Sequence, residues 1–177
     1  MITIFNTILK EPDFFFVKGV CDKVYESGDY IENGTWGENI KGNSNPVYIH
    51  PITCNNIQGM IKRNLESYDV EPLNKNVIKG MMFYYWEEGS YIPWHTDSNH
   101  SAGLTIYLND TWDYQNGGLF LYNHNDTIKT LIPSRNTGVL QVGGMDHSTT
   151  IVRKGSKVRK TIQIFFDTYN TGDKSVI

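Results

Sequence analysis

The stretch YYWEEGSYIPWHTD, residues 84–97, joins a run of aromatic residues to a glycine turn and a His-x-Asp pair. Residues i and i+2 of a β-strand point to the same face, so His95 and Asp97 can aim an imidazole and a carboxylate at one point, while Thr96 faces away. Alone, the pair is weak evidence of a site, because a chain with five histidines can contain one by chance. The sequence on either side must therefore decide between a site and a polar surface turn.

Around this stretch the chain is organised as short strands. Runs rich in β-branched and aromatic residues alternate with glycine, asparagine, aspartate and proline, as in the turn Asn116-Gly117-Gly118. Several short strands at regular spacing are typical of a sandwich or barrel. The predicted strands are 77–86, 101–108, 119–122, 130–132, 138–142 and 158–166. We expect a mainly β fold with a jelly-roll (double-stranded β-helix) core over about residues 77–168.

The N-terminal part, about residues 1–76, predicts helices packed on this core. Pro12 suits a helix start, Asp13 or a neighbour can cap it, and apolar residues then recur at helical spacing: Phe14, Val17, Cys21 and Val24. A second helix is predicted over 54–66. No repeat and no shift in composition marks a boundary, so residues 1–177 are expected to form a single domain.

Between these helices, residues 33–46 are dense in glycine and asparagine, which predicts a loop. A solvated connection is one interpretation. A lid that closes over an active site, with Trp36 touching the substrate, is the other.

Composition excludes several classes of protein. The net charge is −3 and no basic tract stands out, so nucleic-acid binding is not expected. No run is long and apolar enough for a membrane span, and the first residues lack the pattern of a secretory signal. Cys21 and Cys54 lie far apart, without a zinc-binding spacing. We expect a cytoplasmic protein with free thiols, and the oligomeric state stays open.

A third candidate ligand, His147, lies fifty residues beyond Asp97, after the predicted strand 138–142 and a glycine turn. Strands distant in sequence face each other in a jelly roll, so this histidine can complete a site. Two histidines and one carboxylate on one side of a metal form the facial triad of non-haem Fe(II) oxygenases. A tetrahedral zinc site with the same three ligands and a water is the alternative.

The predicted strand 158–166 lies downstream of His147. On one of its faces, the first residues are polar. The residues that share this face are Lys157, Arg159, Thr161, Gln163 and Phe165. A guanidinium beside a small hydroxyl residue suits bidentate binding of a carboxylate inside a barrel. Cations solvated on the outside of the barrel are the competing interpretation.

Five segments, in this order, resemble the Fe(II)- and 2-oxoglutarate-dependent dioxygenases, nearest to the prolyl-hydroxylase-like branch. They are YYWEEGSYIPWHTD, LTIYLNDTW, NGGLFLY, IPSRNTGVLQV and HSTTIVRKGSKVRKTIQIFF. Each segment alone is a loose match, whereas all five in the right order are specific. The resemblance covers roughly residues 77–168, and the N-terminal half carries no such motif.

The resemblance implies roles for individual residues. His95, Asp97 and His147 would bind Fe(II). Two residues would hold the distal carboxylate of 2-oxoglutarate: Arg159 through its guanidinium and Tyr107 through its hydroxyl. Tyr85 is expected to line the pocket, with Tyr84 and Trp86 as competitors, because the length of the turn before His95 is ambiguous.

The anchor of the co-substrate has a second candidate. A gap-free count from His147 places Lys157 where some prolyl hydroxylases carry their anchoring lysine, whereas alignment of the following strand favours Arg159. We prefer Arg159, because the alternation of a strand shifts less easily than the length of a loop. The other histidines, His50, His100 and His124, are expected in turns or on the surface and are not counted as ligands.

The implied reaction hydroxylates a substrate carbon and releases succinate and CO2 from 2-oxoglutarate. It would use Fe(II), 2-oxoglutarate and O2, with ascorbate as a supporting reductant. The leading substrate is a peptidyl proline or another protein side chain, with a free amino acid or other small metabolite as the alternative. A hypothesis from a different class is a non-catalytic, metal-containing jelly-roll binding module.

Overall fold

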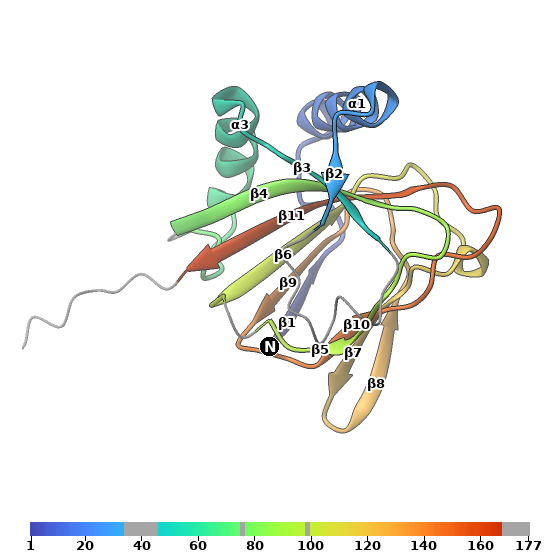
Figure 1. Ribbon diagram of the computed structural model, residues 1–177. Helices are drawn as coiled ribbons and strands as arrows, with labels where there is room; N and C mark the ends of the chain where they lie inside the picture. Colours follow the sequence, from blue (N-terminus) through green and yellow to red (C-terminus); the bar gives the residue numbers. More distant parts are fainter. Residues whose placement is uncertain (34–45, 75–76, 98–99, 168–177) are drawn as a thin grey trace, which may run out of the picture.

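The computed structural model describes residues 1–33, 46–74, 77–97 and 100–167. Two antiparallel sheets face each other, and two helices cover the outer side of the larger one (Figure 1). The helices are α1 (Glu11–Ser27) and α3 (Asn55–Glu66). This arrangement confirms the mainly β fold with N-terminal helices and a jelly-roll core.

The larger sheet has seven strands in the order β1-β9-β6-β11-β4-β3-β2. Their bounds are β1 Ile2–Phe5, β9 Gly138–Val142, β6 Ala102–Tyr107, β11 Arg159–Asp167, β4 Val77–Trp86, β3 Tyr48–Pro51 and β2 Ile31–Glu32. The smaller sheet has the order β5-β10-β7-β8. Its strands are β5 Ile92–His95, β10 His147–Thr149, β7 Phe120–His124 and β8 Thr127–Leu131, and a short 3-10 helix, Tyr114–Asn116, precedes β7.

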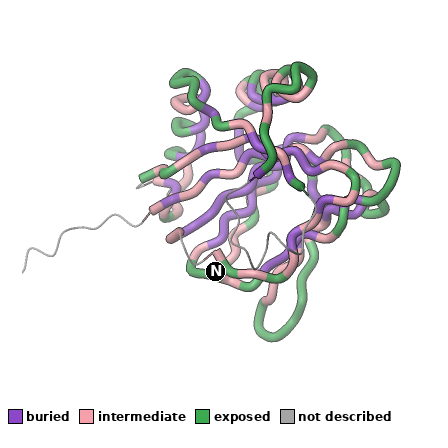
Figure 2. The backbone as a smooth tube through the Cα atoms, in the orientation of Figure 1, coloured by how far each residue is buried: buried purple, intermediate pink, exposed green. Residues whose placement is uncertain are grey.

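Strand β6 is buried at every position, because it has covered faces on both sides (Figure 2). On the outer side of the large sheet, apolar residues pack against the two helices. This core includes Phe14, Val17, Ile61, Leu65, Phe83, Leu104, Ile162 and Ile164. On its inner side, the sheet faces the smaller sheet across the pocket described below. The hydrophobic effect thus fixes which face of each central strand is left for chemistry.

The central pair β4–β11 shows this division residue by residue. Arg159 lies opposite Trp86, Thr161 opposite Tyr84, and Gln163 opposite Met82. Residues directly opposite in an antiparallel pair share a face. Even-numbered residues of this part of β4 and odd-numbered residues of β11 therefore point between the two sheets, and their neighbours point to the helices.

The predicted helices are both present, with one difference in detail. Pro12 lies in the first turn of α1, as expected, but the N-cap residue is Lys10, which makes no side-chain capping bond. Asp13 instead accepts a hydrogen bond from Asn64 of α3, with a distance of 2.7 Å between Asn64 Nδ2 and Asp13 Oδ2. Its side chain is engaged between helices rather than at the end of its own.

The six predicted strands all occur, with ends that differ by a few residues. The sequence patterns missed the short strands β1, β2, β3, β5 and β10. His124 was expected in a turn but ends β7, and the turn itself is Asn125-Asp126, both with positive φ. The predicted loop and its Trp36 fall almost entirely on 34–45, outside the described residues. Within the described residues, no helix reaches the length and hydropathy that a membrane span requires.

Candidate active site

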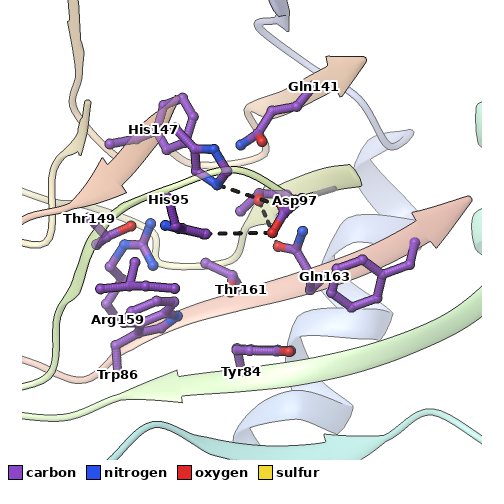
Figure 3. Close-up of a pocket in the computed structure, with 14 residues that line it drawn as sticks. Tyr84, Trp86, His95, Asp97, Gln141, His147, Thr149, Arg159, Thr161 and Gln163 are labelled. Carbon is purple, nitrogen blue, oxygen red and sulfur yellow. Dashed lines mark hydrogen bonds and ion pairs between the residues drawn. The ribbon is translucent and has the colours of Figure 1, made fainter. Parts of the chain in front are cut away.

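Three side chains, from β5, the residues after it and β10, converge in one pocket. His95 ends β5, Asp97 follows two residues later, and His147 begins β10 directly opposite His95. Asp97 Oδ1 lies 3.6 Å from His95 Nε2, and Asp97 Oδ2 lies 3.6 Å from His147 Nε2 (Figure 3). One candidate ligand atom from each residue lies within 4.8 Å of the other two. A single metal ion can be bound by all three.

The two histidines are held in the tautomer that metal binding requires. His95 Nδ1 lies 2.8 Å from the carbonyl oxygen of Pro93, and His147 Nδ1 lies 2.8 Å from that of Met145. A carbonyl only accepts, so each Nδ1 carries the proton and each Nε2 offers its lone pair. Burial and the neighbouring His95 lower the pKa of His147, which favours the neutral, metal-binding form.

Arg159 extends into the same pocket and is only 2% exposed. Its guanidinium carbon lies 4.8 Å from the ring centre of Trp86 and 5.1 Å from that of Tyr107. Arg159 Nε and Nη1 and the Tyr107 hydroxyl have no hydrogen-bond partner of normal geometry in the described part of the chain. A buried cation without a counter-ion is costly. These donors fit a carboxylate supplied by a ligand.

A glycine turn makes room for this arginine. Gly117 and Gly118 both have positive φ, and a Cβ on Gly118 would lie 2.9 Å from Arg159 Cδ. Trp112 Nε1 donates to the carbonyl of Gly117 over 2.8 Å, which fixes the turn. The predicted Asn-Gly-Gly turn is therefore also a support for the guanidinium.

The pocket lies between the two sheets and is partly open to solvent. Its walls come from both sheets: Tyr84, Trp86, Ile92, His95, Asp97, Thr105, Phe120, Gln141, His147, Thr149, Arg159, Thr161, Gln163 and Phe165. Sequence reasoning had not singled out Thr105, Phe120, Gln141 or Thr149. No local motif marks them, because the pairing of strands distant in sequence brings them to the site.

Tyr85 is not among these residues, which corrects the expectation that it lines the pocket. It points to the opposite face of β4, where its hydroxyl donates to the carbonyl of Cys21 in α1 over 3.1 Å. Tyr84 and Trp86 line the pocket instead. The alternation of β4 decides the matter, because the face that carries Phe83 and Tyr85 is buried under the helices.

The remaining candidates lie away from the triad. Lys157 is exposed on the loop before β11. His50 contacts the backbone oxygen of Asp29, and His124 is exposed at the end of β7. The ring centre of His100 lies 4.4 Å from that of Phe165, a pocket residue, but His100 is not part of the ligand cluster.

This geometry can be set beside known proteins. The family model described as the 2OG-Fe(II) oxygenase superfamily matches residues 80–167, which include the triad, Tyr107 and Arg159. The chain belongs to this superfamily. It is therefore a 2-oxoglutarate-dependent dioxygenase that uses Fe(II), 2-oxoglutarate and O2. No curated protein sequence matches the chain.

Solved structures with the same fold cover nearly all of this oxygenase. A prolyl-4-hydroxylase from Pseudomonas putida has a TM-score of 0.74 at 14% identity, over 94% of this chain and 92% of its own. A Trichoplax adhaerens prolyl hydroxylase, in complex with a peptide fragment of the hypoxia-inducible factor oxygen degradation domain, has a TM-score of 0.73 at 19% identity, over 94% of this chain and 83% of its own. A non-haem α-ketoglutarate-dependent epimerase from nogalamycin biosynthesis has a TM-score of 0.67 at 8% identity, over 94% of this chain and 78% of its own. At these identities the likeness concerns the fold alone.

Proposed function

We propose that this dioxygenase hydroxylates a peptidyl proline or another protein side chain, with Fe(II) held by His95, Asp97 and His147. The observation that carries the proposed site is the buried Arg159 guanidinium, which has no counter-ion among the described residues, in the pocket that holds the triad. A metal-binding module needs no such cation. An enzyme that binds an organic dianion beside its metal does.

In this proposal the triad leaves one side of the metal open. Its three ligands come from β5, the residues after it and β10. Three protein ligands would leave the other positions of the metal for the co-substrate and O2. The two backbone carbonyls behind the imidazoles fix the directions of both Nε2 lone pairs.

The distal carboxylate of 2-oxoglutarate would be bound by Arg159 and Tyr107. Arg159 offers a planar pair of donors, and the adjacent Tyr107 offers a hydroxyl that makes no hydrogen bond of normal geometry within the described residues. Burial raises the pKa of Tyr107, so the phenol keeps its proton and can donate it. Lys157 is exposed and is not expected to take part.

Bound at the triad, Fe(II) would let O2 oxidise 2-oxoglutarate to succinate and CO2 and hydroxylate the substrate, with one oxygen atom going to each product. The protein's own residues bind, orient and shield. Trp86 and Tyr107 flank the guanidinium and keep it from water, and Phe120 and Ile92 close the apolar side of the pocket. No side chain is needed as a general base, because the substrate position is a C–H bond.

The proposed substrate class comes from the similar folds. Two of the similar folds are prolyl hydroxylases by name, and one of them binds a peptide. A small-molecule substrate is the second candidate, because the similar epimerase acts in the biosynthesis of nogalamycin. The triad geometry is compatible with both.

The test separates activity from substrate. The purified protein is supplied with Fe(II), 2-oxoglutarate and ascorbate, and succinate is measured without any substrate. We expect slow succinate formation that His95→Ala, Asp97→Ala and His147→Ala each abolish. Equal turnover by any of the three variants would refute the triad.

Proline-containing peptides, free amino acids and host extracts are then offered, and products are searched by mass spectrometry for a gain of one oxygen atom. Oxygen gained by peptides supports the proposal. Oxygen gained only by free amino acids or small metabolites would replace its substrate class.

A further inference from the structure

The three candidate metal ligands differ in how they are supported. Each histidine has a backbone carbonyl behind its Nδ1 atom, 2.8 Å away in both cases. Within the described residues, the ion-pair partners of the Asp97 carboxylate are the two histidines, and no other side chain donates a hydrogen bond to it. A carboxylate that binds metal through one oxygen normally has a hydrogen-bond donor on the other. Asp97 has an opening for such a donor.

Gln163 is placed to fill it. This residue lies on β11, opposite Thr105 of β6, and both line the pocket. The Thr105 hydroxyl donates to Gln163 Oε1 over 2.7 Å. Since the oxygen end of the amide is engaged by Thr105, the NH2 end is the one left to face the pocket.

Gly103 keeps the space between the amide and the carboxylate open. A Cβ at this position would lie 3.3 Å from Gln163 Nε2 and 3.8 Å from Asp97 Oδ2. The amide nitrogen and the carboxylate oxygen therefore border the same point above β6, and the side chains of Gln163 and Asp97 lie next to each other in the close-up (Figure 3). The negative charge of Asp97 favours the NH2 end of the amide on that side, in agreement with the bond from Thr105.

We propose that Gln163 is a positioning residue for the metal site, whose side-chain NH2, oriented by the Thr105 hydroxyl, donates to the Asp97 oxygen that the metal leaves free. The chain of contacts runs from Thr105 through Gln163 to Asp97, across β6 and β11. It fixes the rotamer of the sole anionic ligand. The inference rests on the proposed triad and adds to it the group that orients Asp97.

The test uses Mn(II) alone as the probe, titrated calorimetrically without 2-oxoglutarate. Gln163→Met has a similar shape and no donor, and it should weaken Mn(II) binding by about 10- to 100-fold, the usual effect of removing such a partner. Gln115→Met is the matched control, since Gln115 is an exposed glutamine of the short 3-10 helix and does not line the pocket. Its Mn(II) affinity should stay within about threefold of the wild type.

Thr105 provides the second arm. Thr105→Val keeps the shape and removes the hydroxyl, so it should weaken Mn(II) binding less than Gln163→Met, and Thr105→Ser should restore it. The double variant Thr105→Val/Gln163→Met should bind Mn(II) no more weakly than Gln163→Met, because Thr105 acts only through the amide. The visible absorption spectrum of the Co(II)-loaded protein should change shape in Gln163→Met and stay the same in Gln115→Met.

Wild-type Mn(II) affinity in Gln163→Met would overturn the inference, as would a Thr105→Ser variant no better than Thr105→Val. The variant His95→Ala distinguishes an error about Gln163 from an error about the metal site itself. If His95→Ala loses Mn(II) binding while Gln163→Met keeps it, the triad stands and only the role of Gln163 is wrong. If His95→Ala binds Mn(II) like the wild type, both are wrong.

Discussion

Gly118 and Arg159 lie so close that a single methyl group would not fit between them: a Cβ on Gly118 would lie 2.9 Å from Arg159 Cδ. The same Cβ would lie 3.2 Å from Val152 Cγ2, so it has little room to shift. A turn that is ordinary in sequence terms thus controls the position of the buried guanidinium.

Gly118→Ala should therefore displace Arg159 and raise the Michaelis constant for 2-oxoglutarate by about tenfold or more, since about 1.4 kcal/mol of lost binding energy already gives that factor. Fe(II) affinity should change little. Gly28→Ala is the control, because Gly28 has a similar φ of 72° and a Cβ there would meet nothing within 4 Å. Steady-state kinetics at varied 2-oxoglutarate measure both variants. Equal Michaelis constants in Gly118→Ala and Gly28→Ala would contradict the steric role of Gly118.

Arg159 and Lys157 can be compared directly as anchors of the co-substrate. A carboxylate left in a buried pocket without its cation costs several kcal/mol, whereas an exposed lysine contributes roughly 0–1 kcal/mol. Arg159→Met should raise the Michaelis constant for 2-oxoglutarate by orders of magnitude, and Lys157→Met by a few fold at most. Arg159→Lys should be intermediate, because it keeps the charge and loses the planar pair of donors. If Lys157→Met raises the Michaelis constant for 2-oxoglutarate by orders of magnitude and Arg159→Met leaves it unchanged, Lys157 is the anchor and the assignment to Arg159 is wrong.

The two cysteines should differ in reactivity. Burial raises the pKa of the Cys21 thiol to about 12, whereas Cys54 is exposed at the start of α3. Because the thiolate is the reactive form, iodoacetamide at pH 8 should modify Cys54 and leave Cys21 unmodified in the folded protein. Peptide mass spectrometry after labelling checks this, and labelling in denaturant provides the control in which both react. Rapid labelling of Cys21 without denaturant would show that the α1 side of the core opens.

The sequence predicted some parts of this molecule better than others, for physical reasons. β4 and β11 are long and apolar on the face under the helices, so their existence follows from local pattern. β10 has three residues, His147–Thr149, and is a strand only because β5 and β7 pair with it on both sides. No local pattern specifies such a strand. Long-range pairing does.

The site divides in the same way. The triad and Arg159 lie in motifs that can be read along the chain, and the structure brings all four to one pocket. The bond between Thr105 and Gln163 depends on the register of β6 against β11, which no motif contains. The wrong expectation that Tyr85 lines the pocket has a related cause. Counting back from His95 to the tyrosines crosses a turn whose length the sequence leaves ambiguous. Only the pairing of Tyr84 with Thr161 shows which tyrosine faces inward.

The adjacent tyrosines give a last test, because they should separate stability from activity. Tyr85→Phe removes the hydroxyl that donates to the Cys21 carbonyl, and losing this buried hydrogen bond should cost about 0.5–1.5 kcal/mol of unfolding free energy. Succinate formation at a temperature where the variant is folded should be unchanged, since Tyr85 faces α1. Tyr84→Phe alters the pocket wall opposite Thr161, so it should lower turnover with a genuine substrate and change stability less. Urea unfolding and product assays on both variants decide the matter. If Tyr85→Phe loses activity while it is fully folded, and Tyr84→Phe does not, the pocket would extend to the helical face of β4, and the alternation that orders this site would fail at its central strand.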